Sequence, residues 1–170
     1  MDMKTPSDKI FEAMADRVNF MVQTGFAKVR HLCESPIEEI LLEAIIAYRI
    51  ANYYTFPKMP GLIGNGWNVE PQKHIGSYRV DFLLTDDECE VQTVIECDGH
   101  DFHERTKEQA QRDRERDRSM QSDGFLVLRF TGSEIWRDPW SCVEQIDKAI
   151  MAYGINRQGE RIIDAMIGPA

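Results

Sequence analysis

Two runs of β-branched and aromatic residues, joined by an acidic turn, constrain the fold of this chain most strongly. The first run covers 78–84 (YRVDFLL), the second covers 91–98 (VQTVIECD), and the turn between them includes Asp86, Asp87 and Glu88. Apolar strands separated by a short polar turn are typical of a β-hairpin. The sequence therefore predicts a hairpin in the middle of the chain.

Carboxylates on the two arms are expected to meet on one face of this hairpin. Side chains alternate between the two faces of a strand, so the apolar residues of the first arm should share one face: Val80, Phe82 and Leu84. Asp81 then points the other way, and Glu96 and Asp98 stand opposite the apolar residues of the second arm. In a hairpin centred between Glu88 and Cys89, Asp81 and Glu96 lie across from each other, close enough to share an ion.

Such a cluster indicates catalysis, because neighbouring carboxylates repel one another unless a cation or a proton lies between them. Mg²⁺ prefers oxygen ligands, and a bound cation can generate hydroxide and neutralise charge that builds on a phosphate. The alternative is that Asp81 and Glu96 are two solvated carboxylates on an exposed strand face. Both lie in strands that otherwise resemble core strands, which favours the site.

Length and composition narrow the class of protein. The 170 residues suit one domain, with 42% hydrophobic and 29% charged residues. No apolar stretch is long enough to span a membrane and no signal-peptide pattern opens the chain, so we expect a cytoplasmic location. The four cysteines are scattered and should be reduced thiols. The formal net charge of −9 argues against a broadly basic nucleic-acid surface.

Helical and strand patterns fill the rest of the chain. Apolar positions at near-helical spacing over 7–31 predict one or two helices, with Gly25 as a potential break, that serve as a packing or dimerising arm. Ser35-Pro36-Ile37-Glu38 is a helix start with a capping box, and this helix should end near Asn52. Further elements are expected as a loop over 53–66, a strand over 67–75, a charged helix over 104–121, a strand over 125–130, a short turn of helix after 131–133 and a last helix from Asp138-Pro139.

This order predicts an α/β fold with a mixed sheet of about four strands flanked by helices (α-β-β-β-α-β). The predicted divisions are an N-terminal helical extension (1–33), a central α/β domain (34–153) and a C-terminal tail that packs on the domain (154–170). The helix over 104–121 has almost no apolar surface. It is therefore either a solvated helix with many ion pairs or a helix whose polar inner face serves a site.

An ordered series of motifs resembles the PD-(D/E)xK nuclease superfamily. More narrowly, the series is similar to the branch of uncharacterised domains related to very short patch repair endonucleases. The matching residues extend roughly from Glu34 to Trp136: Ser35-Pro36-x-Glu38, Gln72, Tyr78-Arg79-Val80-Asp81-Phe82, Ile95-Glu96-Cys97-Asp98-Gly99, His103, Arg112-Asp113, Arg116-Asp117 and Gly124-Phe125-x-Val127-Leu128-Arg129-Phe130.

The resemblance implies a restriction-endonuclease-like fold and Mg²⁺-dependent cleavage of phosphodiester bonds, chiefly in DNA, with Mn²⁺ able to substitute. It places Asp81 and Glu96 at the metal-binding acidic positions, with the Cys97 carbonyl oxygen as a further ligand. It also places a catalytic glutamate at Glu38 and a histidine at His103.

One departure concerns the motif lysine, since Asp98 stands where that lysine is expected. A third carboxylate there would add a metal ligand, and His103 or Lys107 would take over the role of the lysine. Asp98-Gly99 could instead only end the strand with a turn. Glu38 could only cap its own helix, and Glu39 is the alternative for the site if that helix is rotated. Gln72, Arg112 and Arg116 are candidate substrate-binding residues, although Gln72 also suits a structural role.

Three functions follow from this sequence. The first is a metal-dependent endonuclease acting on DNA, with a homodimer through the N-terminal helices as a further expectation. The second is an inactive relative that binds nucleic acid or a protein partner. The third is a metal-dependent hydrolase of a smaller phosphate ester.

Overall fold

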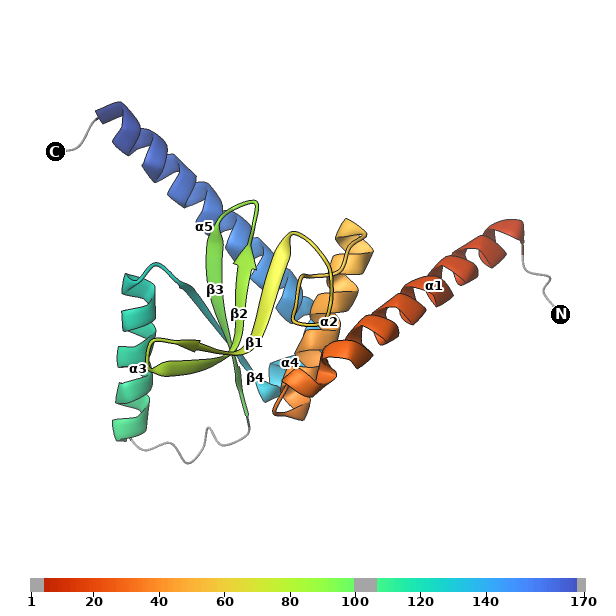
Figure 1. The fold of residues 1–170 in the computed structure, drawn as a ribbon, viewed down its shortest axis with the longest axis horizontal. Helices are drawn as coiled ribbons and strands as arrows, with labels where there is room; N and C mark the ends of the chain where they lie inside the picture. Colours follow the sequence, from red (N-terminus) through yellow and green to blue (C-terminus); the bar gives the residue numbers. More distant parts are fainter. Residues whose placement is uncertain (1–4, 100–106, 168–170) are drawn as a thin grey trace.

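The computed structural model describes residues 5–99 and 107–167. Its centre is a four-stranded sheet in the order β1-β2-β3-β4, with helices on both faces (Figure 1). The strands are β1 (Trp67–Ile75), β2 (Tyr78–Asp86), β3 (Val91–Asp98) and β4 (Leu126–Thr131). The predicted α/β architecture with a mixed sheet is confirmed.

The pairing of the strands follows from the order of elements along the chain. β1, β2 and β3 form an antiparallel meander, whereas β3 and β4 are parallel and are joined through helix α3 (Lys107–Ser122). Phe82 lies opposite Ile95, which is the register of a hairpin centred between Glu88 and Cys89. The predicted register of the hairpin is therefore correct.

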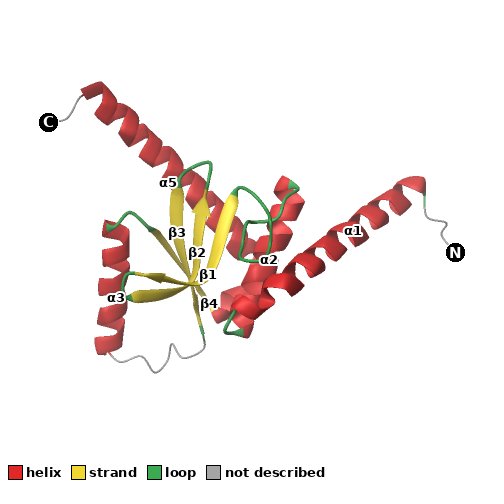
Figure 2. Cartoon of the chain, viewed as in Figure 1, coloured by secondary structure: helices red, strands yellow, loops and turns green. Residues whose placement is uncertain are grey.

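Figure 2 shows the helices in red around the yellow sheet, and side chains cap the first turns of two of them. The Ser35 hydroxyl accepts a hydrogen bond from the Glu38 N–H at 3.3 Å, and Thr131 forms a capping box with Glu134. The helical elements are α1 (Pro6–Val29), the 3-10 turn η1 (Arg30–Leu32), α2 (Pro36–Tyr53), α3 (Lys107–Ser122), α4 (Gly132–Arg137) and α5 (Pro139–Ile167). None of these helices is both long and apolar enough to cross a membrane.

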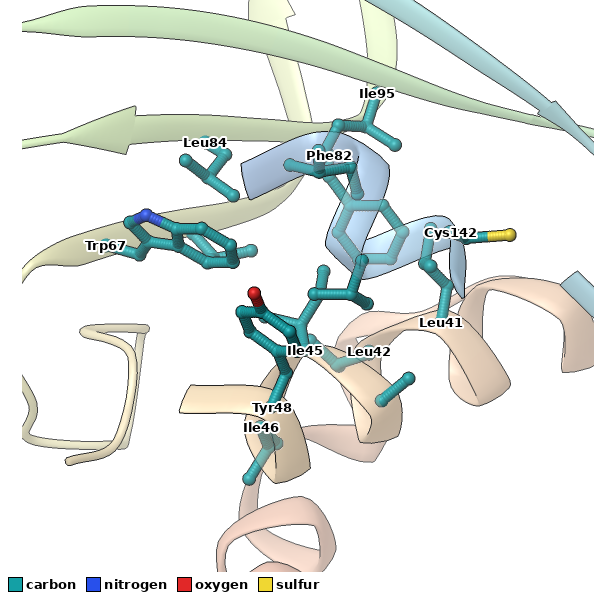
Figure 3. Packing of buried hydrophobic residues seen from close by; sticks show 14 of the residues in the cluster. Leu41, Leu42, Ile45, Ile46, Tyr48, Trp67, Phe82, Leu84, Ile95 and Cys142 are labelled. Carbon is teal, nitrogen blue, oxygen red and sulfur yellow. The ribbon is translucent and has the colours of Figure 1, made fainter. Parts of the chain in front are cut away.

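Two hydrophobic clusters lie on the two faces of the sheet. The larger cluster packs Phe82, Leu84 and Ile95 of the sheet against side chains of α1, α2 and α5 (Figure 3). The smaller cluster joins three strand residues to one residue of α3, namely Val80, Leu83, Val94 and Met120. The charged helix α3 is therefore held by only a little apolar burial, as its composition indicated.

The prediction that Val80 shares a face with Phe82 and Leu84 is wrong. Val80 packs in the smaller cluster, under α3. The reason is a break opposite Asp81, where Gln72 has a left-handed backbone (φ +52°) and no ladder pair joins Gln72 to Asp81. Beyond this point the end of the β1–β2 hairpin turns toward α3 (Figure 1).

Two glycines lie inside helices that the sequence analysis ended, or allowed to end, at these positions. α1 continues through Gly25, where a Cβ atom would lie 2.5 Å from the Phe56 ring. α5 continues through Gly154, where a Cβ atom would lie 2.9 Å from the Cys89 Cβ. Both glycines therefore allow close approach rather than ending a helix. The expected tail from Gly154 is the second half of α5, and Figure 1 shows it extending away from the sheet.

Candidate active site

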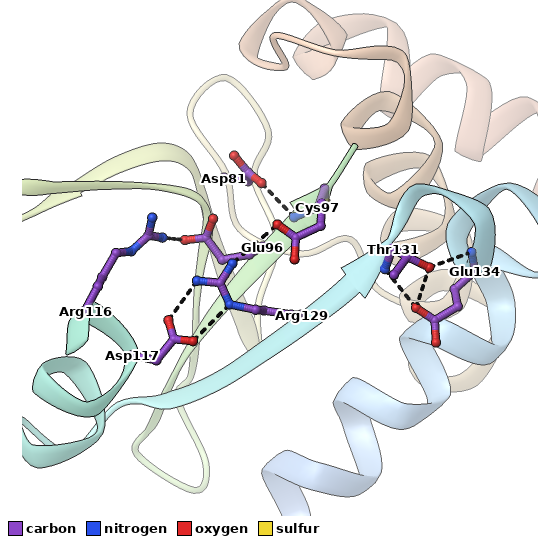
Figure 4. A network of polar contacts seen from close by, with 9 residues as sticks. Asp81, Glu96, Cys97, Arg116, Asp117, Arg129, Thr131 and Glu134 are labelled. Atoms are coloured by element: carbon purple, nitrogen blue, oxygen red, sulfur yellow. Dashed lines mark hydrogen bonds and ion pairs between the residues drawn. The ribbon is translucent and has the colours of Figure 1, made fainter. Parts of the chain in front are cut away.

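Asp81 lies at the point where β2 separates from β3. Its Oδ2 accepts a hydrogen bond from the Cys97 backbone N–H at 2.7 Å, so a side chain satisfies this donor at the end of the ladder (Figure 4). Burial raises the pKa of Asp81, and the nearby Glu38 and Asp98 carboxylates raise it further. The Cys97 N–H and Arg116 act in the opposite direction. Asp81 therefore lies where negative charge exceeds positive charge.

Glu96 and Asp98 are buried carboxylates at the end of β3, each only 7% exposed. The Arg116 guanidinium of α3 binds Glu96, and the Arg129 Nη1 of β4 lies 3.3 Å from the Asp98 Oδ1 (Figure 4). Both carboxylates thus have a cationic partner, as buried charges require. Their position on the α3 side of β3 agrees with the predicted alternation.

Arg129 links this end of the sheet to α3. Its Nη2 lies 2.7 Å from the Asp117 Oδ1, and its Nε donates to the Asp117 Oδ2 at 3.0 Å. This paired, two-bond geometry is among the stronger side-chain contacts. The inner face of α3 is therefore polar and serves the site, which was one of the two alternatives for the charged helix.

Arg116 contacts one of the predicted metal ligands directly, through its ion pair with Glu96. Burial lowers the pKa of its guanidinium, and the neighbouring Arg129 adds to this effect. Its Nε is buried without a hydrogen-bond partner. Its Cζ lies 5.9 Å from the centre of the Tyr78 ring at the tip of the β1–β2 hairpin. Of the two arginines proposed for substrate binding, Arg116 is turned inward and Arg112 lies on the exposed side of α3.

Glu38 caps its helix and also joins it to β1. It is 5% exposed, and its Oε1 accepts from the Ser35 hydroxyl at 2.7 Å. Its Oε2 accepts from the Gln72 Nε2 at 2.7 Å and from the Glu34 N–H at 3.0 Å. Gln72 keeps a buried Oε1 atom without a partner. Glu38 therefore does more than cap its helix.

The two thiols near the site, Cys97 and Cys33, have raised pKa values. Burial, followed by the neighbouring Asp81 and Glu38 carboxylates, raises the pKa of Cys97. Burial and the same carboxylates, with Glu39, raise the pKa of Cys33 to about 12. Both thiols therefore stay protonated at neutral pH. Since the thiolate is the reactive form, this disfavours a nucleophilic role for either cysteine. All four cysteines of the chain are free, as expected.

Comparison with known proteins identifies a family whose model covers this site. A model of the restriction-endonuclease-like family REase_MTES_1575 matches residues 59–150, which include Asp81, Glu96 and Asp98. The chain belongs to the REase_MTES_1575 family. The matched segment contains β1 to β4, α3 and the start of α5. The finer relation to very short patch repair endonucleases stays a prediction.

One relative in Haemophilus influenzae, named only as an uncharacterized protein, is 33% identical over 81 residues. The aligned part is 48% of this chain and 62% of the relative, so the match spans less than two thirds of the relative's length. No solved structure matches the chain. The family therefore supports a nuclease fold, and the reaction has to be inferred from the site.

This member of the REase_MTES_1575 family has side-chain oxygen atoms of the kind that bind a hard cation. Carboxylate oxygens of Asp81, Glu96 and Asp98 are ligands that Mg²⁺ prefers, and the negative charge around Asp81 favours a cation. Within 5–99 and 107–167, however, no three His, Cys, Asp or Glu side chains are arranged to hold a metal ion. Arg116 and Arg129 supply the positive charge in this conformation.

Two further predicted residues are not placed in the site by the structure. His103 lies outside the described residues, and Lys107 is the first residue of α3. The sequence analysis had assigned no role to Arg129, Asp117 or Tyr78. Arg129 could have been found, because a lone charged residue inside the apolar run 125–130 needs a buried partner.

Proposed function

We propose that this chain is a divalent-metal-dependent endonuclease that hydrolyses phosphodiester bonds in DNA, with Mg²⁺ as cofactor and Mn²⁺ as a substitute. The observation that carries the proposal is the gathering of Asp81, Glu96 and Asp98 at one end of β3. Burial and the nearby Glu38 and Asp98 carboxylates raise the pKa of Asp81. The ionised Asp81 therefore costs stability, which favours a functional reason for its presence.

Asp81, Glu96 and Asp98, with the Cys97 carbonyl oxygen, are the groups that would hold the cation. A bound cation supplies activation of water and neutralises charge that develops on the phosphate. Arg116 binds the Glu96 Oε1 and would compete with a metal for that oxygen. Where a metal took it, the guanidinium would be free to bind a phosphate oxygen.

Proton handling is assigned to His103, with Lys107 as the second candidate. Asp98 occupies the place of the motif lysine and cannot orient the attacking water as a cation would. The ordinary pKa of a histidine is near neutrality, which suits proton transfer. Glu38 is held at the same end of the site through its hydrogen bond with Gln72, whose Oε1 is buried without a hydrogen-bond partner in this conformation.

A second candidate function is an inactive nuclease-fold protein that binds nucleic acid or a protein partner. The pairing of Glu96 with Arg116 and of Asp98 with Arg129 favours it, because arginines can replace a metal permanently. Conversion of supercoiled plasmid DNA to nicked circles with Mg²⁺ or Mn²⁺ separates the two functions. We expect nicking by the wild type and none by Asp81→Asn. A folded wild type that binds the plasmid but leaves it intact with either metal would favour the second function.

A further inference from the structure

Tyr78 is an exposed aromatic residue beside the carboxylates of the proposed active site. It begins β2 at the tip of the β1–β2 hairpin, opposite Ile75, and its side chain is 37% exposed. The bend at Gln72 and Asp81 brings this tip to α3, where the Tyr78 ring lies 5.9 Å from the Arg116 Cζ. Arg116 in turn binds Glu96. The Arg116 guanidinium therefore lies between the accessible Tyr78 ring and Glu96, one of the predicted metal ligands.

Within the described residues, the ion pairs of the arginines around the site limit electrostatic attraction to phosphates. The chain has a formal net charge of −9. Three arginines around the site are already paired with carboxylates: Arg116 with Glu96, Arg129 with Asp98 and Asp117, and Arg79 with Glu34 at 2.6 Å. A protein that neutralises few phosphates gains little from counterion release. Affinity for nucleic acid must then come in part from another interaction.

Stacking of a base on the Tyr78 ring supplies such an interaction, since base–aromatic stacking contributes about 1–3 kcal/mol per base. In a duplex, neighbouring base pairs cover the faces of each internal base, so an unpaired or extruded base stacks most readily on a side chain. The position of Tyr78 next to Arg116 suits a base that flanks a phosphate held near Glu96.

We propose that Tyr78 stacks on an unpaired base next to the scissile phosphate, so that the substrate is DNA with an unpaired nucleotide at the cleavage site. This inference rests on the proposed nuclease function and names its substrate class. It assigns to Tyr78 a binding role that depends on the aromatic ring. A tyrosine that only covered the smaller cluster could be replaced by leucine without loss of binding.

The test measures binding of the full-length chain to two DNA probes in EDTA, where metal-dependent cleavage cannot occur. One probe is a short blunt duplex, and the other is the same duplex with one unpaired 2-aminopurine in the middle. The variants are Tyr78→Phe, Tyr78→Leu and Tyr78→Ala. Tyr54→Ala is the control, because Tyr54 is 88% exposed at the end of α2 remote from Glu38. Thermal melts establish that each variant is folded.

We expect the wild type and Tyr78→Phe to prefer the interrupted probe and to quench its 2-aminopurine fluorescence. Tyr78→Leu and Tyr78→Ala should bind that probe about tenfold more weakly, without the quenching, and bind the blunt duplex as the wild type does. The Tyr54→Ala variant should behave as the wild type.

Equal binding and equal quenching by Tyr78→Leu would overturn the inference, and so would an equal loss of affinity for both probes. Either result can coexist with metal-dependent nicking of plasmid DNA by the wild type, in which case only the role of Tyr78 fails. A wild type that binds neither probe and nicks no plasmid would overturn this inference together with the proposed function.

Discussion

Ionisation of Asp81 is costly because its carboxylate is partly desolvated and lies near two other carboxylates. The pKa of Asp81 is raised in the folded chain, so the stability linked to this group is present at low pH and is lost as pH rises through the folded pKa. Asparagine keeps an oxygen that can accept from the Cys97 N–H but carries no charge. The charge at this position therefore reduces stability at neutral pH in the absence of metal.

Asp81→Asn should accordingly raise the Tm of the metal-free chain at neutral pH, by about 2–4 °C for each kcal/mol removed. The difference from the wild type should shrink as pH falls toward about 4, because the wild-type carboxyl then takes up a proton. Melts across this pH range measure the effect, with Asp87→Asn in the exposed turn as the matched control. A lower Tm for Asp81→Asn than for the wild type at neutral pH would show that the charge is not costly.

His103→Ala should lower cleavage roughly a hundredfold, the usual scale for loss of a general acid–base, while metal affinity changes little. Lys107→Ala should have a smaller effect, because its role would be limited to charge. Nicking rates and calorimetric titration with Mn²⁺ measure the two properties separately. Full cleavage by His103→Ala together with loss of cleavage by Lys107→Ala would assign the role of the missing lysine to α3.

Among the elements, α5 shows why Gly154 cannot be understood from local sequence. Alanine is ordinarily favoured over glycine inside a helix by about 1 kcal/mol. A Cβ at Gly154 would lie 2.9 Å from the Cys89 Cβ, in the turn between β2 and β3. Neither atom is at the end of a flexible side chain, so the helix or the turn must shift.

Gly154→Ala should therefore destabilise the chain by about 1–2 kcal/mol, the usual cost of overpacking, in spite of the better helix propensity. Denaturant unfolding measures this change. The double variant with Cys89→Gly removes the opposing Cβ and should recover most of the loss. If Gly154→Ala is more stable than the wild type, the close approach of α5 to the turn is not a constraint.

Local rules predicted most elements, and they failed where tertiary contact decides. The hairpin register followed from the spacing of the apolar runs around the acidic turn, and the start of α2 followed from Ser35 and Glu38. The bend of the hairpin depends on Gln72, a residue type with no marked preference for a left-handed backbone. The face of Val80 was therefore wrong, and the approach of Tyr78 to α3 could not be foreseen.

The candidate site was predictable to a similar extent. Alternation along β3 placed Glu96 and Asp98 on one face, which the contacts with Arg116 and Arg129 confirm. The pairing of Arg129 with Asp117 joins residues of β4 and α3, and no local pattern shows which inner residues of a charged helix will meet a strand.

In the whole molecule, the sheet and its packed helices form a body from which two helical ends extend. Figure 1 shows the first part of α1 and the last part of α5 pointing away from the sheet. Met14 and Phe20 on α1 are 58% and 70% exposed. The homodimer expected through the N-terminal helices stays a prediction, and the proposed site is built from residues of a single chain.

Global stability offers the most direct test of the central claim that Asp81, Glu96 and Asp98 form a divalent-metal site. A cation that binds only the folded chain stabilises it by mass action, by about 2.7 kcal/mol at a hundred times its Kd. Increasing concentrations of Mg²⁺ or Mn²⁺ should therefore raise the Tm of the wild type, as measured in thermal melts. The Tm of Asp81→Asn should show no such rise. An equal rise in both proteins would mean that the ions bind elsewhere and would contradict the proposed metal site.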